Sequence, residues 1–592
     1  MRRTASLLPF LACLALLASC SAGTAPPLAV HVDWGLDGPA GALPSDVVSL
    51  EITVFTDDGA PPQSATNTVG GLMDRDGDGT RESILDNLPL DTEIRITVNA
   101  TTSAGSVGYT GHAGPFMLRA GERRYVDLRM YSVGSFAMVP AGGITPRMLA
   151  TATALGDGRV LVAGGFTRTA SATCPAAYAT ATCFDLTAAD DAYLVDVASG
   201  NVLPVVGGLG QARGGHTATL LPNGRVLLAG GSAHALLILA PTSGAMTFAP
   251  IFQALDTTGP APSSFEVFVP TLNAEEEDVD RDGDPGRGGF VGAADDPTEL
   301  GRLDSPRFLH AAIAVPGHAS QVLLVGGLDS ADTWSVYDDA RAGGYGLLAS
   351  SASALRVPRS SPALAVMQGA MGQGVWIIGG GAAASNADIA EVWTSTTAAP
   401  FGTTTMGFPA SVTMDHPEWS LTGASALTLG ESHAVVTGWL GPLCDPTSAT
   451  PTLPTFTGGT ELCNFPAPSE PVRNFTIDGM TGRPVVTTAG ARHAFGASVA
   501  MSDGTGLVIG GLSDLSLHAT NAVEHWSATV LATGSAQLTD MRPTLMQARA
   551  FHAAAPLDDR GAIVVGGLSV NTTGAAPSIG LVGTVEVVYL GR

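Results

Sequence analysis

The 592-residue sequence contains no lysine, so all 28 of its basic residues are arginine. This absence excludes a Schiff-base lysine and the lysine of a phosphate-binding P-loop. The patterns HExxH, GxSxG and GxxxxGK are absent as well, which removes the commonest signatures of zinc proteases, serine hydrolases and nucleotide sites. The sequence therefore predicts no nucleotide cofactor and offers no ready catalytic motif.

Charged residues are scarce, at 14% of the chain, and positive charge is the scarcer sign. The 53 acidic residues give a formal net charge of −25, and loss of residues 1–19, which hold two arginines and no acid, makes it −27. Such a field repels phosphate backbones, so no nucleic-acid partner is expected. Neutral ligands and divalent cations remain compatible with this charge.

The amino terminus has the pattern of a bacterial export signal. Two arginines precede the apolar run Leu7–Leu17, which is too short to span a bilayer and is typical of a signal peptide. Residues Leu17-Ala18-Ser19-Cys20 resemble the lipobox of bacterial lipoproteins. The resemblance implies a signal peptide over residues 1–19 and lipidation of Cys20, which anchors the protein to a membrane. The alternative is an ordinary signal peptide followed by a chance cysteine.

Family analogy also indicates a destination. Ser21 follows the lipidated cysteine, and no aspartate retention signal is present. In a Gram-negative bacterium the resemblance therefore implies the outer membrane of the cell envelope. Whether the protein faces outward or into the periplasm is left open by these residues.

The remaining cysteines fall into two short-range pairs. Export places them in an oxidising compartment, and no CxxC metal or redox motif is present. We therefore predict the disulfides Cys174–Cys183 and Cys444–Cys463. Each closes a short loop.

A small β domain is expected after the anchor. Residues 20–29 are small and proline-containing, as in a tether. From about residue 30 to 133, segments with period-two alternation and many β-branched residues recur at Val48–Phe55, Glu93–Ala100 and Arg124–Met130. These features predict an immunoglobulin-like β-sandwich, although no Cys–Trp–Cys core is present.

Repeats occupy residues 134–592. Each has an arginine-containing turn, an apolar strand, a polar turn and a second apolar strand that ends in Gly-Gly. A third strand with aromatic or acidic residues follows most of the pairs. Six copies begin at Arg147, Arg213, Arg307, Arg359, Arg492 and Arg549, and a degenerate seventh spans Leu421–Trp439.

These repeats resemble kelch repeats, each of which forms one four-stranded blade of a β-propeller. The resemblance implies an all-β, seven-bladed kelch-type propeller, with six or eight blades as alternatives. The last repeat stops after its third strand, whereas Ser135–Pro140 before the first repeat reads as an isolated strand. We predict that this segment completes the last blade and closes the ring.

An acidic, proline- and glycine-rich insertion is expected at about residues 252–304. It contains one of two D-R-D-G-D stretches, whose alternating carboxylates suit a Ca²⁺ loop. The glutamate that normally ends such a loop is missing from both, so the sequence predicts at most weak structural Ca²⁺ sites, with plain acidic turns as the alternative. The candidate metal-ligating residues are Asp74, Asp76, Asp78 and Glu82, then Asp278, Asp280, Asp282 and Asp284.

Arginine–histidine pairs recur in the turns that start the repeats. A group needed once per blade is a structural residue, so we interpret the arginines as donors to carbonyl groups of the neighbouring blade. Third-strand tryptophans are expected to pack between blades, whereas Trp419 and Trp439 are candidates for a glycan-binding surface. The recurrent pairs are Arg213/His216, Arg307/His310, Arg492/His493 and Arg549/His552.

Kelch propellers include copper radical oxidases and sugar mutarotases. The oxidase resemblance would need a tyrosine next to a histidine, and no Tyr-His pair occurs, so no copper is predicted. We expect a non-enzymatic, lipid-anchored envelope protein whose propeller is a scaffold that binds a protein or glycan. The alternatives are a carbohydrate-active enzyme of mutarotase or lyase type and a structural envelope component. The sequence assigns no catalytic and no ligand-binding residues.

Overall fold

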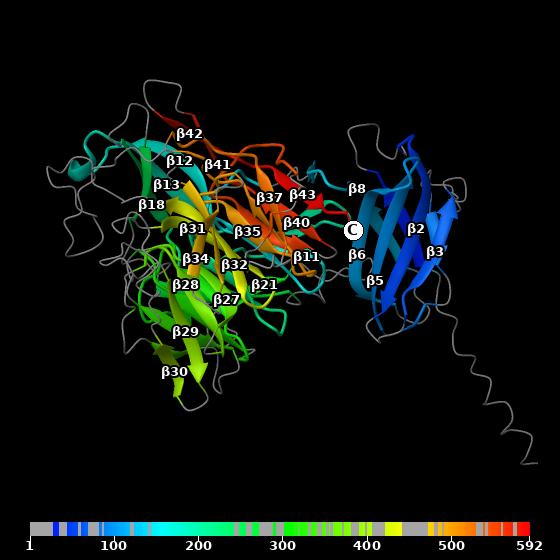
Figure 1. Cartoon of the computed structure of the whole chain (residues 1–592), viewed down its shortest axis with the longest axis horizontal. Coiled ribbons are helices and arrows are strands. Elements are labelled where there is room, and N and C mark those ends of the chain that lie inside the picture. Colours follow the sequence, from blue (N-terminus) through cyan, green and yellow to red (C-terminus); the bar gives the residue numbers. More distant parts are fainter. Residues whose placement is uncertain are drawn as a thin grey trace, which may run out of the picture. The chain divides into compact units, whose positions relative to one another are not determined.

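The structure is a computed structural model whose described secondary structure is almost entirely β (Figure 1). Its only described helix is the single 3-10 turn Ala176–Tyr178. Within the described residues no helix has the length and apolar character needed to cross a bilayer. The described residues are 28–34, 44–56, 61–68, 82–85, 88–90, 92–118, 124–139, 144–241, 248–255, 263–270, 288–291, 301–318, 320–328, 333–339, 346–350, 355, 359–369, 372–380, 390–396, 399–404, 421–440, 472–478, 483–487, 491–514, 516–527, 537–538, 543–557, 560–571 and 577–591.

The chain divides into two compact units between Met130 and Tyr131. The described residues of the first unit form two sheets. Strands β2 and β5 alternate buried apolar and exposed polar residues, as expected for strands with one face on a core. One sheet has the order β4-β1-β7 (Glu82–Leu85, Leu28–Asp33, Arg124–Arg129), and the other contains β3-β2-β5-β6 (Gln63–Thr68, Val47–Thr56, Glu93–Thr102, Val107–Met117).

The second unit carries the repeats as seven antiparallel sheets in its described residues, one sheet per repeat. The second strands of four of these sheets are buried along their whole length, which explains why they are continuously apolar in sequence. The first four sheets are β10-β11-β14-β15 (Thr151–Ala154, Arg159–Ala163, Ala192–Asp196, Asn201–Pro204), β16-β17-β20-β21 (Thr217–Leu220, Val226–Ala229, Ser264–Val269, Gly289–Val291), β23-β24-β25-β26 (Ala311–Ala314, Gln321–Val325, Trp334–Asp338, Gly346–Ser350) and β27-β28-β29-β30 (Ala363–Gly369, Gly372–Ile378, Ala390–Thr396, Ala399–Thr404). The others are β31-β32-β33-β34 (Leu421–Leu429, His433–Leu440, Val472–Asp478, Arg483–Thr487), β35-β36-β37-β38 (Ala497–Ala500, Gly506–Ile509, Val523–Ser527, Gln537–Leu538) and β39-β40-β43-β9 (Ala553–Leu557, Gly561–Val565, Val585–Tyr589, Ala137–Met138).

The sheets form a closed ring. Each first strand contacts the first strand of the next sheet, in the cycle β10, β16, β23, β27, β31, β35, β39 and back to β10. The predicted closing strand is confirmed, since β9 pairs with β43, with Ala137 opposite Val587 and Met138 opposite Glu586. The described residues between 131 and 591 therefore form the expected kelch-type propeller.

Tryptophans of the third strands lie between the blades, as predicted. Trp334 and Trp393 come from consecutive blades, and their ring centroids are 6.4 Å apart. Trp526 is buried against Leu427 and Leu429 of the preceding blade. Apolar contacts of this kind join the sheets along the ring.

The acidic stretch at residues 252–304 differs from the single insertion that the sequence predicts. It contains β20, the buried third strand of the second blade, and β21, which pairs with it. The short strand β22 (Gly301–Arg302) also pairs with β20. The acidic residues therefore lie in segments that separate strands of one blade, and the alternation of Ser264–Val269 (SFEVFV) was the missed strand signal.

Two hairpins build a sheet that the blade pattern does not predict. One hairpin, β12–β13 (Phe166–Ala172, Thr182–Ala188), joins the second and third strands of the first blade, and β18–β19 (His234–Pro241, Phe248–Ala254) does so in the second blade. Strands β13 and β18 pair antiparallel, so the hairpins form one sheet, β12-β13-β18-β19, called the cap sheet below (Figure 1). A third hairpin, β41–β42 (Leu568–Asn571, Ser578–Leu581), occupies the same position in the last blade.

Candidate functional site: the capped mouth of the propeller

The recurrent arginines are fully buried structural groups. Each donates from its guanidinium to the carbonyl of the first glycine in the Gly-Gly pair of its own blade. The sequence interpretation was therefore wrong in one respect, because the accepting carbonyl is not in the neighbouring blade. The Nη1–O distances are 2.8 Å for Arg147–Gly164, 2.6 Å for Arg213–Gly230, 2.9 Å for Arg307–Gly326, 2.6 Å for Arg359–Gly379 and 2.9 Å for Arg549–Gly566.

Carboxylates in or just before the third strands form ion pairs with several of these guanidinium groups. Arg213 binds the buried Glu266 at 2.6 Å, and Arg549 binds the buried Glu586. Arg147 binds both oxygens of Asp191, at 2.8 and 2.9 Å. Burial raises the pKa of Asp191, but hydrogen bonds and charge from Arg147 outweigh this and hold the pKa below its ordinary value.

The glycine pairs form the seams between blades. The N–H of Gly165 donates to the carbonyl of Arg213 in the next blade at 2.8 Å, and that of Gly567 donates to Arg147 at 2.7 Å, which closes the ring. Gly164 has a φ of +55°, and a Cβ there would lie 2.4 Å from the Arg213 carbonyl oxygen. Only glycine permits this approach of two backbones.

Histidines three residues after the arginines also lie in the seams. The Nε2 of His216 is 3.0 Å from Oγ1 of Thr151 in the preceding blade, and that of His310 is 2.9 Å from Oγ1 of Thr217. Burial lowers the pKa of His216 and of His552 to about 3 and that of His310 well below its ordinary value. These imidazoles are neutral near pH 7 and are packed between blades, so a structural role explains their recurrence.

The sixth blade departs from the pattern. His493, and not Arg492, occupies the buried arginine position, because its Nδ1 is 2.7 Å from the carbonyl of Gly510 and its Nε2 is 3.8 Å from Oε2 of Glu524. Glu524 is buried as well, accepts a bond from Trp526 at 3.2 Å and lies against the N–H of Ala491. The assignment of Arg492 to the recurrent set is therefore corrected.

The residues two positions after these arginines and after His493 surround the mouth of the ring. Backbone bonds link successive blades there, from Leu149 N–H to the Phe551 carbonyl at 2.9 Å and from Phe551 N–H to the Phe495 carbonyl at 2.8 Å. Two further hydrogen bonds of 2.9 Å continue this series, from the Leu309 N–H to the Gly215 carbonyl and from the Gly215 N–H to the Leu149 carbonyl. The four non-glycine members have φ between 52° and 56°, a strained region that the ring of bonds maintains.

The cap sheet packs on this ring of residues. Its buried face presents Phe184, Leu186, Leu237 and Phe252, which share one apolar cluster with Leu149, Leu309, Phe495 and Phe551. The rings of Phe252 and Phe551 meet edge to face with centroids 5.4 Å apart. In the described residues, this mouth of the propeller is thus filled by apolar side chains, and the strand register places the Arg and Gly-Gly loops on the same side.

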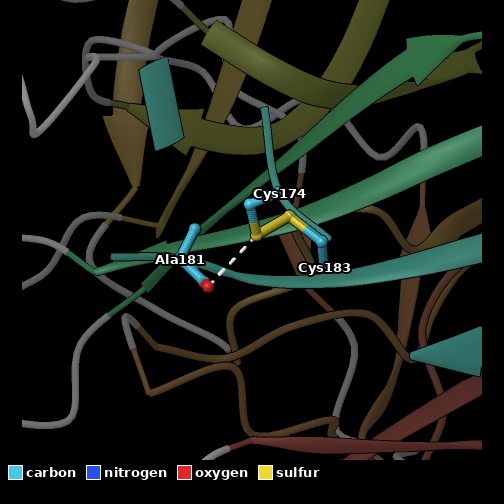
Figure 2. The surroundings of a disulfide bond; sticks show 3 residues. All are labelled: Cys174, Ala181 and Cys183. Atoms are coloured by element: carbon cyan, nitrogen blue, oxygen red, sulfur yellow. Dashed lines mark hydrogen bonds between the residues drawn. A yellow bond between two sulfur atoms is a disulfide. The ribbon is translucent and has the colours of Figure 1, made fainter. Parts of the chain in front are cut away.

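The disulfide predicted between Cys174 and Cys183 is confirmed, with an S–S distance of 2.02 Å. It ties the β12–β13 connection to the cap sheet (Figure 2). The connection holds the buried Tyr178 against Leu236 and Ile238 on the outer face. The Cys174 Sγ lies 3.1 Å from the Ala181 carbonyl oxygen (Figure 2), and since a disulfide sulfur carries no proton, this is a close contact and not a hydrogen bond.

The other predicted site residues lie outside the described part of the chain, except that Glu82 is in β4, where only its backbone is described. Trp439 is likewise described only through the backbone of β32. Outside the description are Cys20, Asp74, Asp76, Asp78, Asp278, Asp280, Asp282, Asp284, Trp419, Cys444 and Cys463.

Antiparallel sheets joined in a ring by arginine and Gly-Gly seams form a β-propeller of the kelch type. No protein-family profile and no curated protein matches the sequence. Among solved structures, a fungal alcohol oxidase of the AA5 family in complex with copper is 15% identical, with 74% of this chain and 72% of that chain covered and a TM-score of 0.41. The structure of YjhT is 10% identical, with 74% and 97% covered and a TM-score of 0.31. Similarities at this level concern the fold alone.

Proposed function

We propose that the protein is a non-enzymatic, lipid-anchored component of the cell envelope whose propeller binds a protein or glycan. The capped mouth carries this proposal. The repeated arginines, histidines and carboxylates bond to one another and to backbone groups within and between blades, and among the described residues apolar side chains fill the capped mouth. Ligand binding on such a scaffold belongs to its outer loops and hairpins.

The proposal includes a membrane anchor and a location for the protein. Lipidation of Cys20 attaches the chain to a membrane, and the outer membrane of a Gram-negative envelope is the proposed site. The two D-R-D-G-D stretches would bind Ca²⁺ weakly and stiffen their loops. Labelling of growing cells with an alkyne fatty acid tests the anchor, because the Cys20→Ala chain should lose the label and leave the membrane fraction.

A glycan array tests the binding function. The full chain with Cys20→Ala is purified from the periplasm of an expression host and probed with and without Ca²⁺. Retention of defined glycans, with recovery of the same glycans unchanged, supports a binding scaffold. Conversion of any bound sugar, seen by NMR of its anomeric protons, favours the carbohydrate-active enzyme instead. Self-association with no ligand favours the structural envelope component.

A further inference from the structure

The outer face of the cap sheet collects polar groups from three strands. Arg168 in β12 is opposite Thr187 in β13, and Thr187 is opposite His234 in β18. Asp185 is two residues from Thr187 on the same strand. Opposed residues, and residues two apart, project from the same face of a sheet. Since Leu186 projects into the buried cluster, these four side chains belong to the solvent face.

The same residues line two shallow depressions. The larger, of about 630 Å³, runs along β12 and β13 and includes Arg168, Asp185 and Thr187. The smaller, of about 300 Å³, includes Asp185, Thr187 and His234. Since both contain Asp185 and Thr187, they form one trough across the strands. Leu581 of β42 lies at one end, and Leu255, which is 50% exposed, lies at the other.

The charged groups of the trough differ from those in the blades. Arg213 and Glu266 are buried and bonded to each other, whereas Arg168 and Asp185 are both exposed. In the described part of the chain neither of these two makes an ion pair or side-chain hydrogen bond. Their groups are therefore available to a ligand. The sheet that presents them is held by the mouth of the ring on one side and by the disulfide on the other, so the site is rigid before binding.

The chemistry of the trough suits a chain of sugar hydroxyls. A carboxylate accepts, a guanidinium donates, and threonine hydroxyls do both, while the exposed Leu255 can pack on the C–H face of a sugar ring. One positive and one negative group make the trough close to neutral, and the net charge of −25 disfavours polyanions. The three strands span on the order of 10 Å, which suits a short oligosaccharide.

We infer that the trough across β12, β13 and β18 is a binding site for a neutral glycan chain, with Arg168 and Asp185 as its main hydrogen-bonding groups. This inference rests on the proposed function and names its site and ligand class. His234 adds a polar group at the end near Leu255.

The test uses the full Cys20→Ala chain and a panel of fluorescent neutral hexasaccharides, namely α- and β-linked glucans, mannans and xylans. Asp185→Asn and Arg168→Gln should each weaken binding of the retained hexasaccharide by about tenfold or more, because each removes a charged hydrogen-bonding partner. The matched controls are Glu431→Gln and Arg302→Gln, which change the same charges at exposed positions outside the trough and should leave binding unchanged. Equal melting temperatures show that all four variants fold.

Three results would overturn the inference. If a hexasaccharide binds and neither trough variant weakens it, the glycan site lies elsewhere while the proposed function stands. If only acidic glycans bind, and Arg168→Gln alone weakens them, the ligand class is wrong. If no hexasaccharide binds, the trough is not a glycan site, and the proposed function then depends on capture of a protein partner.

Discussion

At the residue scale, buried histidines in the blade seams make the stability of the fold sensitive to acid. His216, His310 and His552 are neutral in the folded protein because burial lowers their pKa values. The unfolded chain takes up protons at its ordinary pKa of about 6.5. Since the unfolded state binds more protons between pH 6.5 and about 3, the free energy of unfolding falls as the pH falls through this window. Each histidine contributes about 1.4 kcal/mol per pH unit.

We predict that His216→Gln reduces this acid sensitivity. Glutamine can keep a hydrogen bond to Thr151 but takes up no proton, so the variant should lose less stability than the wild type between pH 7 and pH 5. The difference is at most about 2 kcal/mol, measured as the shift of the thermal midpoint at the two pH values. His518→Gln is the control, because the His518 side chain is 58% exposed. Identical pH profiles for wild type and His216→Gln would contradict the prediction.

The sixth blade offers a second prediction at a single position. His493 makes one bond, to Gly510, and its Nε2 is 3.8 Å from Glu524, beyond hydrogen-bond distance. An arginine there would reach both groups, as Arg549 does in the last blade. We expect His493→Arg to stabilise the protein by about 1.5 kcal/mol, the size of a hydrogen bond to a charged group, measured by thermal unfolding at pH 8.

The reciprocal variant is the control. Arg549→His removes the same interactions from the last blade and should lower the melting temperature. If His493→Arg also lowers it, the histidine position differs in shape from the arginine position, and the equivalence of the two sites is refuted.

Residue positions were predictable where the repeat spacing is regular. Arg147, Arg213 and Arg549 each precede the first glycine of their pair by 17 residues, and so does His493, whereas Arg492 precedes it by 18. Arg307 and Arg359 precede theirs by 19 and 20 residues, so the spacing favours His493 over Arg492 only by comparison with the regular blades. The carboxylate partners could not be predicted, because Glu266 and Asp191 meet their arginines only after the strands have paired.

At the scale of elements, the cap sheet depends on its disulfide. The bond closes a loop of nine residues in sequence separation, and such a loop stabilises by about 2–3 kcal/mol. We predict that Cys174→Ser with Cys183→Ser frees Tyr178 and speeds amide hydrogen exchange in β12 and β13. The melting temperature of the propeller should change little, since no blade seam passes through this loop. A matching drop in exchange protection across β40 and β43 would show that the cap is part of the global core.

Sequence analysis identified the blade strands but not the cap sheet. The inner strands are short apolar runs that end in Gly-Gly, and local patterns of this kind are readable. The strands of the cap alternate weakly, as in Phe166–Ala172 (FTRTASA), and β13 pairs with β18 from another repeat. Pairing between hairpins of different repeats is a tertiary outcome, which no single-segment pattern contains.

At the scale of the whole molecule, stability depends on closure of the ring. A chain that begins at Tyr131 keeps β9, whereas a chain that begins at Gly142 lacks it and leaves the edge of β43 unpaired. We predict that the shorter chain melts at a lower temperature and associates through the exposed edge. Calorimetry and light scattering after size exclusion measure both effects. Equal melting temperatures for the two chains would show that β9 is dispensable.

The pairing of β9 with β43 fixes an order of events during synthesis. The ribosome makes β9 before any blade and β43 after the others, so the growing chain carries an unpaired strand until translation ends. The entropy lost on joining such distant segments rises only with the logarithm of the separation. The delay before β43 is made, and not its separation from β9 in sequence, therefore limits ring closure, because every incomplete chain has an open ring.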